Sequence, residues 1–168
     1  MRILESRLTP EQEAAAPLPD FAPVVLGLLS IGGAAWGLIA IAMLLLQSWP
    51  GLLSALLVGA VAAVFAFGAY VGVLALRRTP GWLRKSTVFW ALQIPLVLSP
   101  AVSYALASGG YFAVWLQLHP PVKVGANFLL GSTFTLKLLS GGPVVVGVNL
   151  FALGIFLFLL RVQAKSAT

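Results

Sequence analysis

The chain has 168 residues, of which 60% are apolar and only 8% are charged, and its mean hydropathy is +1.03. A typical soluble domain is about 45–50% apolar and about 25% charged, so this chain has too few polar side chains to cover a globule in water. The composition excludes a soluble enzyme and a free-standing nucleic-acid-binding domain. It predicts a small protein that crosses a membrane several times.

The net charge of +6 follows the pattern of charges that orient membrane helices. All four acids lie in the first twenty residues: Glu5, Glu11, Glu13 and Asp20. Six of the ten cations flank apolar segments in short clusters: Arg77, Arg78, Arg84, Lys85, Arg161 and Lys165. Such clusters do not form a basic face for phosphates, and we expect no nucleic-acid partner.

Residue types that bind metals or carry out catalysis are scarce. Cysteine is absent and His119 is the only histidine, so thiolate, iron–sulfur and histidine-rich metal sites are excluded. A serine–histidine pair would need His119 as its base, and no acid follows Asp20 to orient that side chain. We expect no enzymatic activity and no cofactor.

The chain begins with a polar head, residues 1–20. Thr9 can cap a short surface helix, because Pro10 suits the first helical position and Gln12 can return the capping bond.

A long uncharged run from Phe21 to Leu76 follows. It is more than twice the ~20 residues that cross a hydrocarbon core of ~30 Å. Pro50 and Gly51 mark a tight turn near its middle. The sequence therefore predicts two antiparallel transmembrane helices, over residues 23–47 and 52–76.

Two further transmembrane helices are predicted after a basic loop, residues 77–85. The uncharged run from Ser86 to Leu118 exceeds one span, and Ser108-Gly109-Gly110 can end a third helix over residues 86–108. Pro95 and Pro100 would kink this helix. A fourth helix over residues 143–160 begins at Pro143 and ends before Arg161.

The expected fold is therefore all-α, a bundle of four transmembrane helices in one domain over residues 21–165, with a short tail at 166–168. With both termini cytoplasmic, eight of the ten Lys and Arg residues face the cytoplasm, as the positive-inside rule favours. The low charge, the Ala/Gly/Leu-rich composition and the lack of cysteine suit a bacterial inner membrane.

Residues 111–142 form an apolar segment that this topology places outside the cytoplasm. Residues 122–124 and 133–138 alternate with period two. One predicted face holds Val122, Val124, Phe134, Leu136 and Leu138, and the other holds Lys123, Thr133, Thr135 and Lys137. We predict a β-hairpin or an irregular cap on the membrane surface. An interfacial helix is the alternative, which Gly125 and Gly131 disfavour.

Three sets of residues are candidates for function. Small residues at four-residue spacing serve packing within the bundle or docking on a partner: Gly33, Gly37, Gly59, Gly68 and Gly72. The third predicted helix holds a kink that is either static or part of a solute path: Gln93, Pro95, Ser99, Pro100 and Ser103. Lys123 and Lys137 are either a solvated pair or a contact for an anionic lipid.

No ionisable residue lies inside a predicted span, which argues against a proton-coupled carrier, an ion pump or a voltage sensor. The leading hypothesis is a non-catalytic accessory subunit that packs against other membrane subunits or its own copies. The alternative is a small oligomeric channel or carrier for a neutral or lipid-like solute, gated at the kink. A third hypothesis is a protein that binds membrane lipids or an isoprenoid through the cap and its two lysines.

Overall fold

The computed structural model describes residues 19, 21–47, 51–118, 120–139 and 141–166. The predicted surface helix of the polar head, Pro50 of the predicted turn and His119 lie outside these residues. The described chain contains a six-stranded sheet besides its helices, so the predicted all-α four-helix bundle is wrong.

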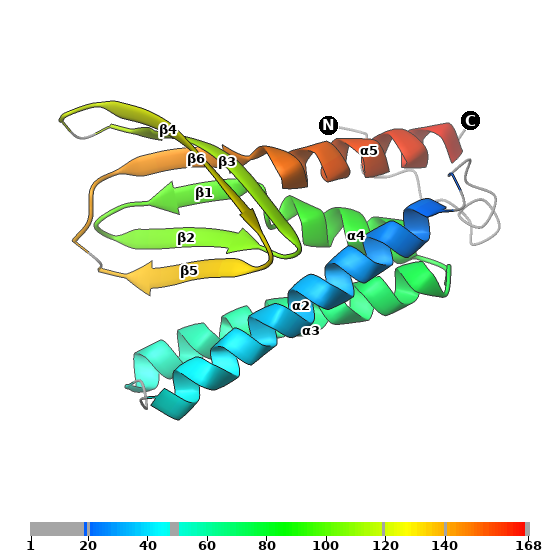
Figure 1. Ribbon diagram of the computed structural model, residues 1–168, viewed down its shortest axis with the longest axis horizontal. Coiled ribbons are helices and arrows are strands. Elements are labelled where there is room, and N and C mark those ends of the chain that lie inside the picture. The colour runs from blue at the N-terminus through cyan, green and yellow to red at the C-terminus, as the bar shows by residue number, and fades with distance from the viewer. Residues whose placement is uncertain (1–18, 20, 48–50, 119, 140, 167–168) are drawn as a thin grey trace.

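The elements follow a simple order along the chain (Figure 1). The helices are α2 (Phe21–Gln47), α3 (Leu52–Leu76), α4 (Trp82–Ala91) and α5 (Leu150–Ser166). The strands are β1 (Pro95–Leu98), β2 (Val102–Ala107), β3 (Gly110–Gln117), β4 (Lys123–Leu130), β5 (Thr133–Leu138) and β6 (Val145–Asn149). The sheet is therefore inserted between α4 and α5.

Among the described helices, α2 and α3 are the two that are long and apolar enough to cross a membrane. They cover the predicted ranges 23–47 and 52–76 and form an antiparallel hairpin. The two backbones approach closely at glycines, because a Cβ added at Gly72 would lie 2.8 Å from the carbonyl oxygen of Gly27. These helices support a membrane location for the protein.

The predicted third helix over residues 86–108 is wrong. Helix α4 ends at Ala91, Pro95 begins β1, and Pro100 lies in the turn between β1 and β2. Proline lacks a backbone N–H and is tolerated at the first residue of a strand and in turns, so it punctuates strands here rather than kinking a helix. The gated kink has no structural basis.

The predicted fourth helix over residues 143–160 is half correct. Within this range, Val145–Asn149 form β6, whose valines suit a pleated surface. Helix α5 begins only after Asn149, whose side-chain oxygen accepts a 3.4 Å hydrogen bond from the backbone N–H of Ala152 and caps the helix. With 17 residues, α5 falls short of the ~20 that a full span requires.

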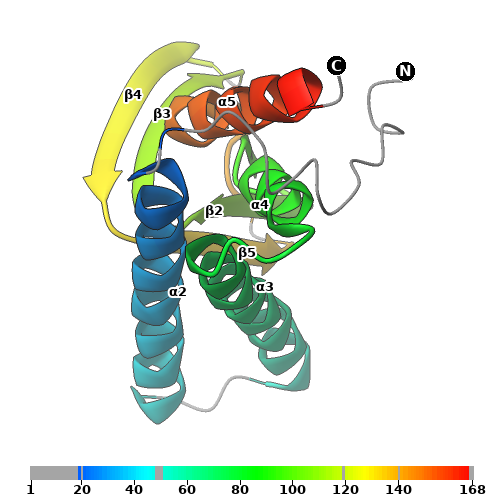
Figure 2. The same ribbon diagram turned by 90° about the vertical axis from the view of Figure 1, so that its right-hand side faces the viewer.

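The sheet is antiparallel throughout, with the order β4-β3-β6-β1-β2-β5. Strands β4 and β5 pair with β3 and β2 and stand at opposite edges, so the predicted hairpin between them is wrong. Only Gly131 and Ser132 separate the two edge strands in the chain, and so short a connection spans at most about 11 Å. The sheet therefore curls into a half-barrel, visible from its end in Figure 2.

Helices cover two parts of this half-barrel. Helices α2 and α3 pack on the convex side of β2 and β5, where Phe65 meets Phe134 edge-on with ring centroids 6.0 Å apart. Helices α4 and α5 pack together at one end of the sheet, around the fully buried Trp90 and Leu159. No helix of the described residues covers the concave side of the sheet.

Candidate functional site

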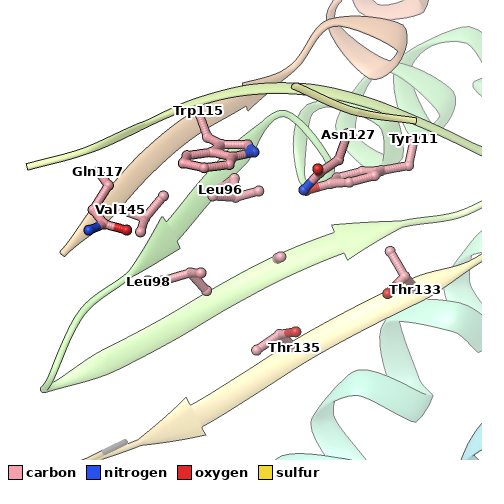
Figure 3. A pocket seen from close by; sticks show the side chains of 10 residues that line it. Leu96, Leu98, Tyr111, Trp115, Gln117, Asn127, Thr133, Thr135 and Val145 are labelled. Atoms are coloured by element: carbon pink, nitrogen blue, oxygen red, sulfur yellow. The ribbon is translucent and has the colours of Figure 1, made fainter. Parts of the chain in front are cut away.

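A cavity of about 380 Å³ lies on the concave face of the half-barrel (Figure 3). All six strands contribute to its wall, which combines apolar, aromatic, hydroxyl and amide side chains. The lining residues are Leu96, Leu98, Ala105, Tyr111, Trp115, Gln117, Asn127, Thr133, Thr135 and Val145. The volume lies within the range of small-molecule pockets, about 300–1,000 Å³. The wall itself carries no charge.

Trp115 is held in place by two glycines and an amide. Gly125 and Gly147 are its partners on the neighbouring strands, and a Cβ at Gly147 would lie 2.9 Å from the Cβ of Trp115. With the oxygen and nitrogen of the Asn127 amide exchanged, as its hydrogen-bonding neighbours require, the amide oxygen accepts a 3.3 Å hydrogen bond from the indole N–H of Trp115. The fixed indole ring lies on the wall of the cavity with Leu96 (Figure 3).

Tyr111 places a phenol at the inner end of the same wall. A phenol is protonated at neutral pH, so it can donate or accept a hydrogen bond without adding charge.

One row of directly paired residues crosses all six strands at the end of the sheet opposite α4 and α5. In order from edge to edge, the row is Lys123, Gln117, Val145, Leu98, Ser103 and Lys137. Side chains alternate along a strand, so Lys137 shares the face of Thr135, and Lys123 shares the face of Asn127. The two lysines therefore flank the outer rim of the cavity from opposite edges.

This rim is electrostatically positive. Lys123 and Lys137 are both exposed, and the sequence contains no acid after Asp20 that could neutralise them from the sheet. The structure thus places the two lysines predicted as an anionic-lipid contact around a single opening, although they are 14 positions apart in the chain.

Four of the five predicted packing glycines meet atoms of their own chain. A Cβ added at Gly33 would clash with the backbone of Gly109, and one added at Gly37 would lie 2.5 Å from the ring of Phe65. A Cβ added at Gly68 would clash with Phe89, and one added at Gly72 would clash with Gly27. A Cβ at Gly59 would meet nothing within 4 Å. Docking on a partner through these glycines stays a prediction.

The residues of the predicted kink are dispersed. Gln93 is fully buried, where its amide donates to the carbonyl oxygen of Phe89 at 3.3 Å and accepts from the backbone N–H of Ser108 at 2.7 Å. Ser99 hydrogen-bonds within the turn before β2, with 2.7 Å between its hydroxyl and the carbonyl oxygen of Val102. Of this set, Ser103 is the residue in the rim row. The five residues of the predicted kink therefore do not line a common solute path.

Trp115, Tyr111 and Asn127 line the cavity and were not predicted from the sequence. In the sequence these three residues alternate with apolar neighbours, as expected for strands. Apolar residues also lie on the same face as these three, however, so the alternation is hard to recognise. None of the described residues is an Asp, Glu, Cys or His, and no metal-ligand cluster was found among them. Comparison with known proteins found no matching family model, no similar curated protein and no matching solved structure.

Proposed function

We propose that this chain is a non-catalytic integral membrane protein that binds an amphiphile with an anionic headgroup in the hollow of its sheet. The observation that carries the proposal is the rim row, which has a lysine at each end and opens into a largely apolar cavity. A ligand with one charged end and one apolar end matches that arrangement.

The two parts of the site would act on different parts of the ligand. Leu96 and Trp115 supply apolar and aromatic surface for a hydrocarbon portion, while Thr133 and Thr135 offer hydroxyl groups for ester or hydroxyl oxygens. Exposed lysines attract anionic headgroups, and the effect is greatest where no acid competes. The neutral wall of the cavity disfavours a ligand that is charged throughout.

A lysine substitution series tests this proposal. Dihexanoyl phosphatidic acid would be titrated into the detergent-purified protein, with tryptophan fluorescence as the readout and dihexanoyl phosphatidylcholine as the neutral comparison. We expect Lys123→Gln with Lys137→Gln to weaken phosphatidic acid binding about tenfold and to leave phosphatidylcholine binding unchanged.

The matched control removes two charges elsewhere, by Arg84→Gln with Arg161→Gln. Both arginines are exposed and lie on α4 and α5, away from the rim. This control should bind phosphatidic acid like the wild type. A headgroup site at the rim would be contradicted if both double variants bound phosphatidic acid equally weakly, or if neither bound it more weakly than the wild type.

The second candidate is a subunit of a larger membrane assembly or of a homo-oligomer. The first turns of α3 favour it, because Leu52, Leu53 and Leu56 are 79%, 58% and 64% exposed and Gly59 nearby faces open space. Stoichiometric co-purification from native membranes, lost on Gly59→Leu, would support this role. A chain that purifies alone in mild detergent would contradict it.

A further inference from the structure

We infer that the uncovered convex face of the half-barrel contacts the acyl chains of the bilayer, so that the sheet is embedded in the membrane beside α2 and α3. This inference concerns the outer surface of the sheet and does not depend on any ligand in the cavity.

The part of the convex face that no described helix covers is apolar throughout. It belongs to β1, β3, β4 and β6, and its residues are Pro95, Val97, Phe112, Val114, Leu116, Val124, Ala126, Phe128, Leu130, Val146 and Val148. On the edge strand β4, Val124, Phe128 and Leu130 are 73%, 69% and 75% exposed. A face of this extent is not stable against water.

The two faces of the sheet differ in polarity. The outward positions of β1, β3, β4 and β6 are apolar, while the polar side chains of these strands, such as Gln117, Lys123 and Asn127, lie on the concave face beside the buried Leu96 and Val145. Strands of membrane barrels likewise direct apolar residues toward lipid on their outer face.

The convex face is continuous with the surface of the membrane helices. The half formed by β2 and β5 is covered by α2 and α3 through Leu106, Phe134 and Leu136. The uncovered half extends from there, and β4 and α2 lie along the same side of the molecule in Figure 2. The exposed apolar side chains of α2 include Trp36, Ile39 and Met43. One lipid environment can therefore cover both surfaces.

Helix lengths place the sheet at a definite depth. Arg161 follows the first residue of α5, Leu150, by eleven positions, which is about 16 Å along a helix. That is about half of the ~30 Å hydrocarbon core, so if Arg161 marks one membrane surface, the sheet begins near the midplane. The eight residues of β3 extend up to about 26 Å further along the strand, which is more than the ~15 Å that remain of the hydrocarbon core, so the lysine rim lies outside the core on the opposite side.

The unpaired edge of β4 is compatible with this depth. Backbone groups outside helices and closed barrels are tolerated in a membrane where they border a water-filled cavity. Strand β4 contributes Asn127 to the wall of the cavity, so its free edge lies beside the cavity rather than wholly against acyl chains.

Single-cysteine labelling tests the inference directly, because the chain contains no native cysteine. Phe128→Cys and Val124→Cys share the convex face of β4 at different depths, and Asn127→Cys lies on its concave face. Each variant would carry an NBD fluorophore in phosphatidylcholine vesicles. Quenching would be measured with doxyl-labelled lipids and with aqueous iodide.

We expect doxyl lipids to quench the label at Phe128→Cys strongly and from a deeper chain position than at Val124→Cys, whereas iodide should reach only Asn127→Cys efficiently. Iodide quenching of Phe128→Cys equal to that of Asn127→Cys would place the face in water and overturn the inference. Protection of Phe128→Cys from both quenchers would also overturn it, because a protein surface would then cover the face. Val148→Cys, in the middle of the sheet, repeats the test if an edge label disturbs β4.

Discussion

The hydroxyl of Ser132 donates a hydrogen bond of 2.6 Å to the carbonyl oxygen of Gly33, which joins the crossover between β4 and β5 to the middle of α2. The backbone N–H of Gly109 donates to the same hydroxyl at 3.4 Å. Because Gly33 lacks a Cβ, the loop around Gly109 can lie directly against the helix. This junction holds the two sheet edges together at their inner end, while the lysine rim stays open.

Ser132→Ala should loosen this junction. The substitution removes a bond between residues 99 positions apart in the chain and leaves the carbonyl of Gly33 without that donor. We expect a loss of about 1–2 kcal/mol in the free energy of unfolding, measured by denaturant titration in detergent. Ser99→Ala is the matched control, because its bonds lie within one exposed turn, and it should cost clearly less. Equal losses would show that the junction contributes no special stability.

Two glycine substitutions on the membrane helices should have opposite effects. Gly33→Ala drives a Cβ into the backbone at Gly109 and into the Ser108 side chain, so we expect a loss of about 1–3 kcal/mol in the free energy of unfolding. Gly59→Ala meets open space and should be neutral or stabilise by up to about 1 kcal/mol through helix propensity. Thermal denaturation in detergent measures both. A destabilised Gly59→Ala would indicate that a contact outside this chain uses that position.

Gln93→Leu should weaken the connection between α4 and the sheet. It leaves the backbone N–H of Ser108 buried without its 2.7 Å acceptor, which costs about 1–3 kcal/mol. Gln117→Leu makes the same chemical change at the exposed rim and should alter stability by less than about 0.5 kcal/mol. Indistinguishable unfolding curves for the two variants would argue against the Gln93 bridge.

The two long helices could be predicted because length, lack of charge and a Pro-Gly turn are sufficient evidence for membrane spans. Residues 95–107 were misassigned to a helix for a physical reason. Leu96 and Leu98 face a cavity while Val97 faces outward, so both faces of β1 are apolar and period-two alternation disappears. Without that contrast, an apolar strand and a buried helix look alike in the sequence.

The site was predicted only where its polar residues alternate with apolar ones. Thr133, Thr135 and Lys137 were placed on one face of a strand, and the structure has β5 at that position with its threonines toward the cavity. The pairings of β5 with β2 and of β6 with β3 depend on contacts between segments that the helical interpretation had separated. The row that joins Lys123 to Lys137 therefore could not be derived before the sheet order was known.

Native mass spectrometry of the protein purified from its own membranes in mild detergent is the most direct test of the cavity. We predict that the wild type retains one anionic amphiphile per chain and that Thr135→Trp, which fills the cavity, loses it while remaining folded. Leu138→Trp, on the outward face of the same strand, should retain the ligand. A wild-type chain that carries no amphiphile, or a Thr135→Trp variant that still retains it, would contradict a binding site in the hollow of the sheet.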